Sequence, residues 1–194
     1  YCTYCTFKKF WAFNKKCEHK PLKNWCHYYF KENSGPGLSR NYGCQKSKSN
    51  YYIVLDSDCI LPTHYFKTVK RELQENFTDV FGGPDKAHNT FTNLQKAINY
   101  SMTSFLTTGG MRGHKKNMLA KFYPRSHNMG LKKKIFEKVG GFGSLRHGQD
   151  IELSHRILNS GAKVELLIDA VVYHRRRTTL KKFFRQVFNW GVAR

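Results

Sequence analysis

The chain has 194 residues, a formal net charge of +21 and an aromatic content of 15%. This length allows one domain with a hydrophobic core and excludes two ordinary domains, and no apolar run approaches the roughly 18 residues of a membrane span. The charge indicates an anionic partner, and by itself it leaves nucleic acid, lipid headgroups and phosphorylated substrates open. No signal peptide is visible, and because the chain begins at Tyr1 and stops inside an amphipathic pattern, we expect a fragment of a longer protein.

Residues 1–27 are aromatic, basic and rich in cysteine, and their pattern has no clean period, so we assign no element to them. Two interpretations of the cysteines stay open. They form a structural zinc site, for which the spacing of the second cysteine pair is wide, or they are reduced, unpaired thiols. The candidate ligands are Cys2, Cys5, Cys17, Cys26, His19 and His27.

A turn-rich stretch at residues 32–37 precedes a predicted helix over residues 38–48, with Arg40 and Asn41 in its first turns. A helix that follows a glycine-rich loop presents free backbone N–H groups and a positive dipole end to an anion. The segment therefore predicts either a phosphate site or an ordinary junction between a loop and a helix.

The central feature of the sequence is an apolar run at residues 51–55 that stops at Asp56 and Asp58, as in a buried strand that reaches the edge of a sheet. Side chains at positions i and i+2 of a strand point the same way, so both carboxylates can face one point. At a separation of about 5 Å they would repel by roughly 3 kcal/mol. A divalent cation shared with substrate phosphates would offset this repulsion, and the alternative is a solvated turn.

The second half of the chain contains further helix and strand signals. Thr92 and Gln95 fit a capping box that opens a helix. Residues 148–158 predict another helix with Asp150 at or near its N-cap, where an aspartate is also favoured for purely structural reasons. Predicted strands over residues 164–168 and 170–173 lead directly into His174 and three arginines.

The last segment, residues 179–194, predicts a helix with an apolar face and an opposite basic face. A helix of this kind either packs on the core of its own domain or lies in a membrane interface. The sequence leaves both possibilities open.

Several short motifs occur together, in order, and resemble the inverting family-two glycosyltransferases, in their bacterial membrane-associated branch. The motifs are N-S-G-P-G-L-S-R-N-Y-G at 33–43, L-D-S-D at 55–58, N-M-G-L at 128–131, V-G-G-F at 139–142, G-Q-D-I-E-L-S at 148–154 and A-V-V-Y-H with R-R-R at 170–177. The resemblance covers residues 28–194 and implies an α/β chain of the GT-A type, with a Rossmann-like mixed sheet flanked by helices. It divides the chain into an unassigned segment at 1–27, a partial catalytic domain at 28–178 and a basic amphipathic helix at 179–194.

The resemblance also implies roles for individual residues. Asp56 would contact the ribose or sugar of a nucleotide-diphosphate donor, and Asp58 would bind the Mg²⁺ or Mn²⁺ that bridges the diphosphate. Arg40 and Asn41 would lie near the nucleotide. The remaining roles are a sugar or acceptor pocket at Asn128 and Met129, a general base at Asp150, a further metal ligand at His174, and neutralisation of the departing diphosphate by Arg175, Arg176 and Arg177.

The sequence departs from the family pattern in two places. Gln149 stands where the family usually has a glutamate before the base. The strands that open the family's nucleotide pocket are not recognisable ahead of residue 28, so we expect the N-terminal part of the fold to be missing and one edge of the sheet to be exposed.

The predicted function is that of a hexosyltransferase-type enzyme that moves a sugar from a nucleotide-diphosphate donor to a glycan, lipid-linked or other hydroxyl acceptor, with inversion. The resemblance implies a cytoplasmic location at the inner face of the cell membrane, with the membrane surface as a partner, and nucleic acid is not expected to bind. Two alternatives remain: a basic zinc-containing nucleic-acid-binding protein, and an inactive remnant of a glycosyltransferase.

Overall fold

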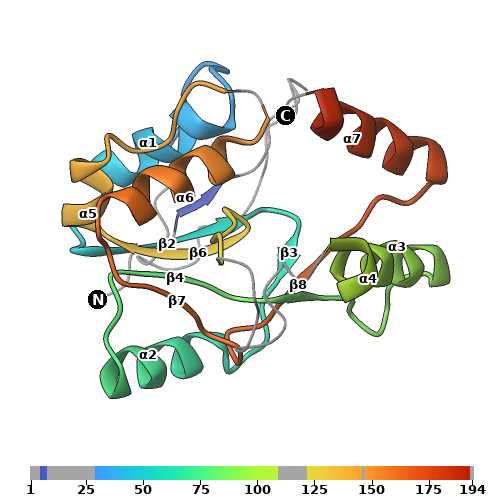
Figure 1. Cartoon of the computed structure of the whole chain (residues 1–194), viewed down its shortest axis with the longest axis horizontal. Helices are drawn as coiled ribbons and strands as arrows, with labels where there is room; N and C mark the ends of the chain where they lie inside the picture. The colour runs from blue at the N-terminus through green and yellow to red at the C-terminus, as the bar shows by residue number, and fades with distance from the viewer. Residues whose placement is uncertain (1–4, 8–28, 109–121, 146, 193–194) are drawn as a thin grey trace.

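The computed structural model describes residues 5–7, 29–108, 122–145 and 147–192, and its main feature is a five-stranded mixed sheet (Figure 1). The strand order is β1 (Cys5–Phe7), β2 (Tyr51–Asp56), β6 (Asn128–Lys132), β4 (Val80–Gly82) and β7 (Val164–Leu166). β1 is parallel to β2 and β4 is parallel to β7, whereas β6 runs antiparallel to both β2 and β4.

Strand β1 corrects the expectation that no strand precedes residue 28. It pairs in parallel with β2, with Cys5 opposite Val54 and Phe7 opposite Asp56. One strand from the N-terminal segment therefore lies beside the strand that carries Asp56. The sequence did not indicate it because three residues are too few for an alternating pattern to be recognised. The other predicted zinc ligands and the rest of residues 1–28 lie outside the described residues.

A second, three-stranded sheet consists of β3 (Cys59–Ile60), β8 (Val172–His174) and β5 (Asp85–Lys86), in that order. β3 follows β2 after a two-residue turn, and β5 follows β4 in the same way, so the small sheet extends from the ends of the large one. Cys59 lies opposite His174 in the antiparallel β3–β8 pair, and the Arg175 N–H donates to the Asp58 carbonyl at 2.9 Å. This pairing brings Asp58 and His174 together although the chain separates them widely.

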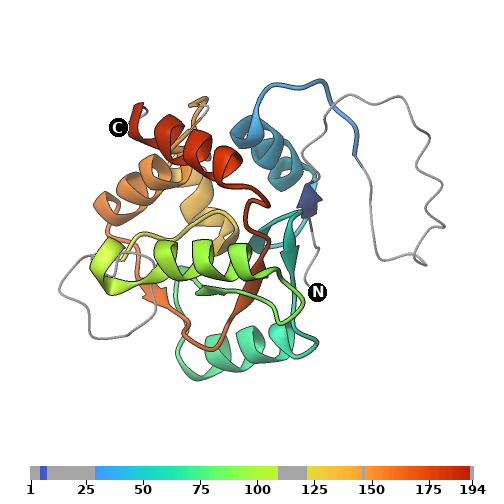
Figure 2. The same ribbon diagram turned by 90° about the vertical axis from the view of Figure 1, so that its right-hand side faces the viewer.

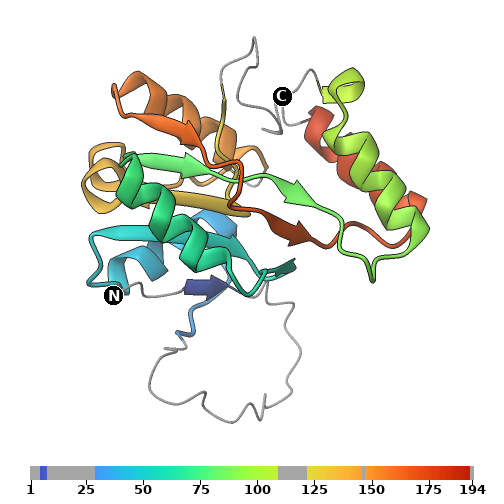
Figure 3. The same ribbon diagram turned by 90° about the horizontal axis from the view of Figure 1, so that it is seen from below.

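Helices cover both faces of the large sheet. α1 (Pro36–Lys46), α5 (Lys133–Lys138) and α6 (Gln149–Asn159) lie on one face, and α2 (Tyr65–Glu75) lies on the other, where Figure 3 shows it crossing the sheet. β2 serves both cores by its two-residue alternation. Tyr52 and Val54 belong to the core under α1, α5 and α6, whereas Ile53 and Leu55 belong to the core under α2.

The remaining helices lie at one end of the molecule: α3 (Asn93–Thr103), α4 (Phe105–Thr108) and α7 (Leu180–Val192) (Figures 1 and 2). The predicted capping box opens α3, because the Gln95 N–H donates to the Thr92 hydroxyl and the Thr92 N–H donates back to the Gln95 side chain. α7 has no buried residue. Among the described residues, no helix combines the length and the apolar character that crossing a membrane requires.

Candidate active site

A cavity of about 220 Å³ lies between the end of β2, the start of α6 and one side of α7. It brings together Asp56, Asp58 and Asp150, the three carboxylates that the sequence analysis placed at one site. The other lining residues are Arg125, Ser126, His127, His147, Gly148, Ile151, His174, Arg175, Arg176, Arg177, Gln186 and Trp190. Nearly all these side chains are polar, and four of them are arginines, so the cavity suits an anionic, hydroxyl-rich ligand.

The end of β2 is fixed by a buried arginine. The Arg40 Nη2 atom lies 2.6 Å from the Asp56 Oδ1 atom, and the guanidinium also lies over the Phe142 ring at 5.3 Å from its centroid. Arg40 is only 8% exposed and does not line the cavity. Arg40 therefore contacts Asp56 from the side away from the cavity, and the positive charge of its guanidinium offsets part of the repulsion that was expected between Asp56 and Asp58.

The second carboxylate of the pair faces a histidine. The Asp58 Oδ1 atom lies 3.2 Å from the His174 Nε2 atom, where β3 begins and β8 ends. The other ring nitrogen of His174, Nδ1, lies 3.7 Å from the Asp85 Oδ2 atom. The His127 ring stacks on the His174 ring with a centroid distance of 4.9 Å. His174 is thus held between an exposed carboxylate in the cavity and a buried one behind it.

Asp85 is the centre of this buried network, and sequence reasoning missed it. It is 1% exposed and forms an ion pair with Arg176, which in turn donates to the Asn99 side chain at 3.0 Å. The Arg176 carbonyl accepts a hydrogen bond from Gln95 on α3 at 2.9 Å. The available signal was the position of Asp85, a carboxylate directly after the β4 strand and its Gly-Gly-Pro turn.

The network sets the protonation of its members. Burial alone would raise the pKa of Asp85, but His127, His174 and Arg176 outweigh it and hold that pKa well below its usual value. Burial would lower the pKa of His174, yet hydrogen bonds to Asp58 and Asp85 raise it overall. Burial lowers the pKa of His127 to about 4, so this ring is neutral at physiological pH.

Asp150 lies at the second position of α6, and the N-cap is Gly148, which has a left-handed φ of 76°. Its Oδ1 atom accepts from the Ile151 N–H at 3.0 Å, and its Oδ2 atom lies 3.7 Å from the Arg125 Nη1 atom. The side chain is 20% exposed. Asp150 therefore does not fill the N-cap position and presents one carboxylate oxygen toward the cavity arginine.

Gln149, the residue that replaces the family glutamate, is buried against α1. It is 6% exposed, and its Oε1 atom has no hydrogen-bond partner. Gly37 on α1 leaves no room for a side chain because Gln149 Oε1 and Phe142 lie directly against it. Gln149 thus packs between α6 and α1, and it does not line the cavity with Asp150.

Three other predicted site residues have structural contacts instead of a place in the cavity lining. Asn41 donates to the Phe142 carbonyl and accepts from the Phe142 N–H, both at 2.8 Å. Asn128 is fully buried, accepts from the Tyr65 hydroxyl at 2.6 Å and donates to the Ala170 carbonyl at 2.6 Å. Met129 is fully buried in the core under α1, α5 and α6. The side chains of these three residues point into the protein and not into the cavity.

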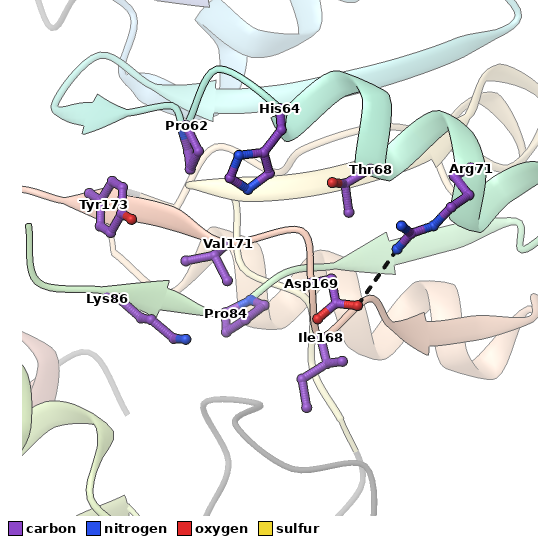
Figure 4. Close-up of a pocket in the computed structure, with 10 residues that line it drawn as sticks. All are labelled: Pro62, His64, Thr68, Arg71, Pro84, Lys86, Ile168, Asp169, Val171 and Tyr173. Carbon is purple, nitrogen blue, oxygen red and sulfur yellow. Dashed lines mark ion pairs between the residues drawn. The ribbon is translucent and has the colours of Figure 1, made fainter.

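Another cavity, of about 600 Å³, lies between α2 and the β5–β8 pair (Figure 4). It contains none of the predicted site residues. Its charged groups include Arg71 and Asp169, whose Nη2 and Oδ2 atoms lie 3.7 Å apart. Both of these side chains are more than half exposed to water, so the ion pair contributes little to stability.

Two groups of side chains have the spacing of a metal site: Asp58 with Cys59 and His174, and Asp85 with His127 and His174. Arg176 already occupies the Asp85 carboxylate, and its guanidinium would repel a cation there. In the first group, the Cys59 thiol donates to the His127 carbonyl at 3.5 Å, and its soft sulfur is a poor ligand for Mg²⁺ or Mn²⁺, which prefer oxygen. Asp58 and His174 remain, a carboxylate and an imidazole that fit Mn²⁺ with Asp85 behind the ring as its support.

Comparisons with known proteins agree with this architecture. Residues 11–140 match the family model described as Glycosyl transferase family 2. Residues 1–349 of S. aureus TarS in complex with UDP-GlcNAc superpose with a TM-score of 0.54 at 17% identity, over 75% of this chain and 40% of that one. A second structure of the same TarS fragment gives 0.54 at 18% identity, over 84% and 46%. No curated protein matches the sequence.

The chain thus spans less than half the length of the TarS fragment that it resembles. The likeness in architecture confirms the predicted α/β fold of the GT-A type, with mixed sheets flanked by helices. The family match begins at residue 11, well before residue 28, where the motif resemblance was expected to start.

Proposed function

Because the chain belongs to glycosyl transferase family 2, we propose that it transfers a sugar from a nucleotide-diphosphate donor to an acceptor hydroxyl, with inversion. The observation that carries this proposal is the cavity that three carboxylates from β2, the β2–β3 turn and α6 share with arginines. The solved relative with UDP-GlcNAc supports a nucleotide-sugar donor as the substrate class. For the acceptor we propose a hydroxyl of a glycan, a lipid-linked sugar or a similar molecule.

Donor binding would use the β2 end of the cavity. Asp56, oriented by Arg40, accepts hydrogen bonds from hydroxyl groups of the ribose or the sugar. Arg175 and Arg177 are exposed at the cavity wall, where they can pair with diphosphate oxygens. Arg176 also borders the cavity, but its buried guanidinium is engaged by Asp85, and we assign it a supporting role.

A divalent cation, Mg²⁺ or Mn²⁺, would be held by Asp58 and His174, and it would neutralise charge on the leaving diphosphate. Arg176 and Asp85 would fix the orientation of the His174 ring, since the Arg176 Nη1 and Asp85 Oδ2 atoms lie 3.2 Å and 3.7 Å from its Nδ1 atom.

Asp150 is proposed as the general base. It removes the proton of the acceptor hydroxyl while the acceptor oxygen forms a bond to the anomeric carbon. The bond from that carbon to the diphosphate oxygen breaks on the opposite side, and the diphosphate departs with the bonding electrons toward Arg175 and Arg177. Arg125, whose Nη1 atom lies 3.7 Å from the Asp150 Oδ2 atom, would help to hold this carboxylate in the cavity.

The test combines Asp150→Asn with the control Glu152→Gln, which removes a charge from the same turn of the same helix but lies outside the cavity. Donor binding is measured by calorimetry with Mn²⁺ and a panel of UDP- and GDP-sugars, and turnover by release of the free nucleotide. We expect Asp150→Asn to bind donor as the wild type does and to lose about 10²- to 10⁴-fold in turnover.

Two results would contradict the proposal. If the folded wild-type chain produces no binding heat with any donor, the chain is an inactive remnant. If Asp150→Asn turns over at the rate of Glu152→Gln, then Asp150 is not the base, even when donor binding is intact.

A further inference from the structure

α7 has an apolar face that no described part of the protein covers. We call the α7 face the side chains of Leu180, Phe184, Val187, Phe188 and Val192, which are between 45% and 73% exposed. They recur every three to four residues and so lie along one side of the helix. Soluble monomers rarely expose a contiguous apolar stripe of this kind, and such stripes mark surfaces that bind a partner or a membrane.

The same helix has a different side toward the protein. Gln186 and Trp190 line the cavity, and the Gln186 side chain accepts from the Arg177 Nε–H at 3.3 Å. On a helical wheel each of these two positions lies about 120–160° from Phe184 and from Val192. The contacts of Gln186 and Trp190 at the cavity therefore fix the orientation of α7, and in this orientation the α7 face points away from the protein.

Basic side chains flank the α7 face. Lys181, Lys182 and Arg185 are all exposed, and the helix has no acidic residue. An amphipathic helix with phenylalanine and leucine on one side and lysine and arginine beside them is the arrangement that enters the headgroup region of an anionic bilayer. The cations attract the lipid phosphates, and the apolar face enters the acyl boundary.

A second group of exposed apolar side chains lies at the same end of the molecule, on α3 and α4 (Figures 1 and 3). Tyr100 is 72% exposed, Phe105 70% and Leu106 91%. Nucleic acid would use the cations but not these apolar groups. A second copy of the chain is disfavoured as a partner, since two chains with a formal charge of +21 repel each other.

We propose that the α7 face docks on the surface of an anionic lipid bilayer. Binding in this way would place the wall of the cavity that carries Gln186 and Trp190 next to the lipid headgroups. The inference does not depend on the proposed glycosyltransferase activity, because it rests on exposure and charge alone.

The experiment measures co-sedimentation of the chain with vesicles of phosphatidylcholine, with and without phosphatidylglycerol. Phe184→Gln/Phe188→Gln removes the centre of the α7 face, and Phe30→Gln is the matched control because Phe30 and Phe184 are both 72% exposed. Lys181→Gln/Lys182→Gln/Arg185→Gln removes the flanking cations and keeps good helix formers. Circular dichroism and melting midpoints establish that each variant is folded.

We expect the wild type and Phe30→Gln to bind anionic vesicles more tightly than neutral ones. The double phenylalanine variant should lose about 100-fold in partition coefficient, at about 1.5 kcal/mol for each phenylalanine. The triple variant should lose about fivefold for each cation removed, and only with anionic vesicles.

Three outcomes would overturn the proposal. The first is that the wild type fails to bind anionic vesicles, and the second is that it binds neutral vesicles equally well. The third is that the double phenylalanine variant binds anionic vesicles as tightly as the wild type does. If size-exclusion chromatography with light scattering shows a wild-type dimer that the double variant abolishes, and vesicles do not bind, the α7 face is a contact between two copies instead.

Discussion

Asp85→Asn is the substitution that probes the buried network most directly. The change removes the negative charge but keeps nearly the same size and one hydrogen-bond acceptor. Arg176 is 5% exposed, so its guanidinium would stay buried without its charged partner. The remaining contacts of Arg176, including the hydrogen bond to Asn99 at 3.0 Å, do not neutralise it.

The expected cost follows from this burial. Removing one partner of a buried ion pair typically costs about 3–5 kcal/mol, because the other charge is left uncompensated. Asn99 and the new amide recover part of this cost, so we expect a loss of about 3 kcal/mol in the free energy of unfolding. For a chain of this size that corresponds to a melting midpoint lower by roughly 6–12 °C.

The assay is urea unfolding followed by circular dichroism, with Glu137→Gln as the control. Glu137 pairs with Lys133 at 3.9 Å on the surface, where its side chain is 62% exposed, so its loss should cost about 0.5 kcal/mol or less. A similar cost for Asp85→Asn and Glu137→Gln would show that Asp85 and Arg176 do not form the buried pair on which the His174 arrangement depends.

Two further substitutions test residues whose side chains point away from the cavity. Met129→Ala should lose about 2–5 kcal/mol in the free energy of unfolding, because it leaves a cavity at a fully buried site, and donor affinity measured by calorimetry should stay unchanged. A large loss of donor affinity at unchanged stability would show instead that Met129 contributes to the binding pocket. Asn41→Ala should lose about 1–3 kcal/mol in urea unfolding, since the Phe142 N–H and carbonyl both lose their partner. Gln45→Ala, at an exposed position of the same helix, is the control, and a similar loss in it would show that the Asn41 contacts contribute nothing specific.

The local elements of this protein were predictable from neighbouring residues. The apolar run at 51–55 predicted strand β2 and the position of its two carboxylates at the strand end, because alternation and a polar stop are short-range signals. Thr92 and Gln95 predicted the start of α3, because a capping box joins two residues that are only three positions apart in the sequence. The order of the family motifs indicated the fold, and with it the segments that meet at the cavity.

The partners of the site residues were decided only by the tertiary structure. Asp58 meets His174 because β3 pairs with β8, and Asn41 meets Phe142 across 101 positions of the chain. The position of Asp85 after β4 marks the end of a strand, but it does not distinguish a surface carboxylate from the centre of a buried network with His174 and Arg176. Periodicity and capping report contacts within a few residues, whereas burial and long-range ion pairs depend on strand order, and strand order exists only once the whole chain has folded.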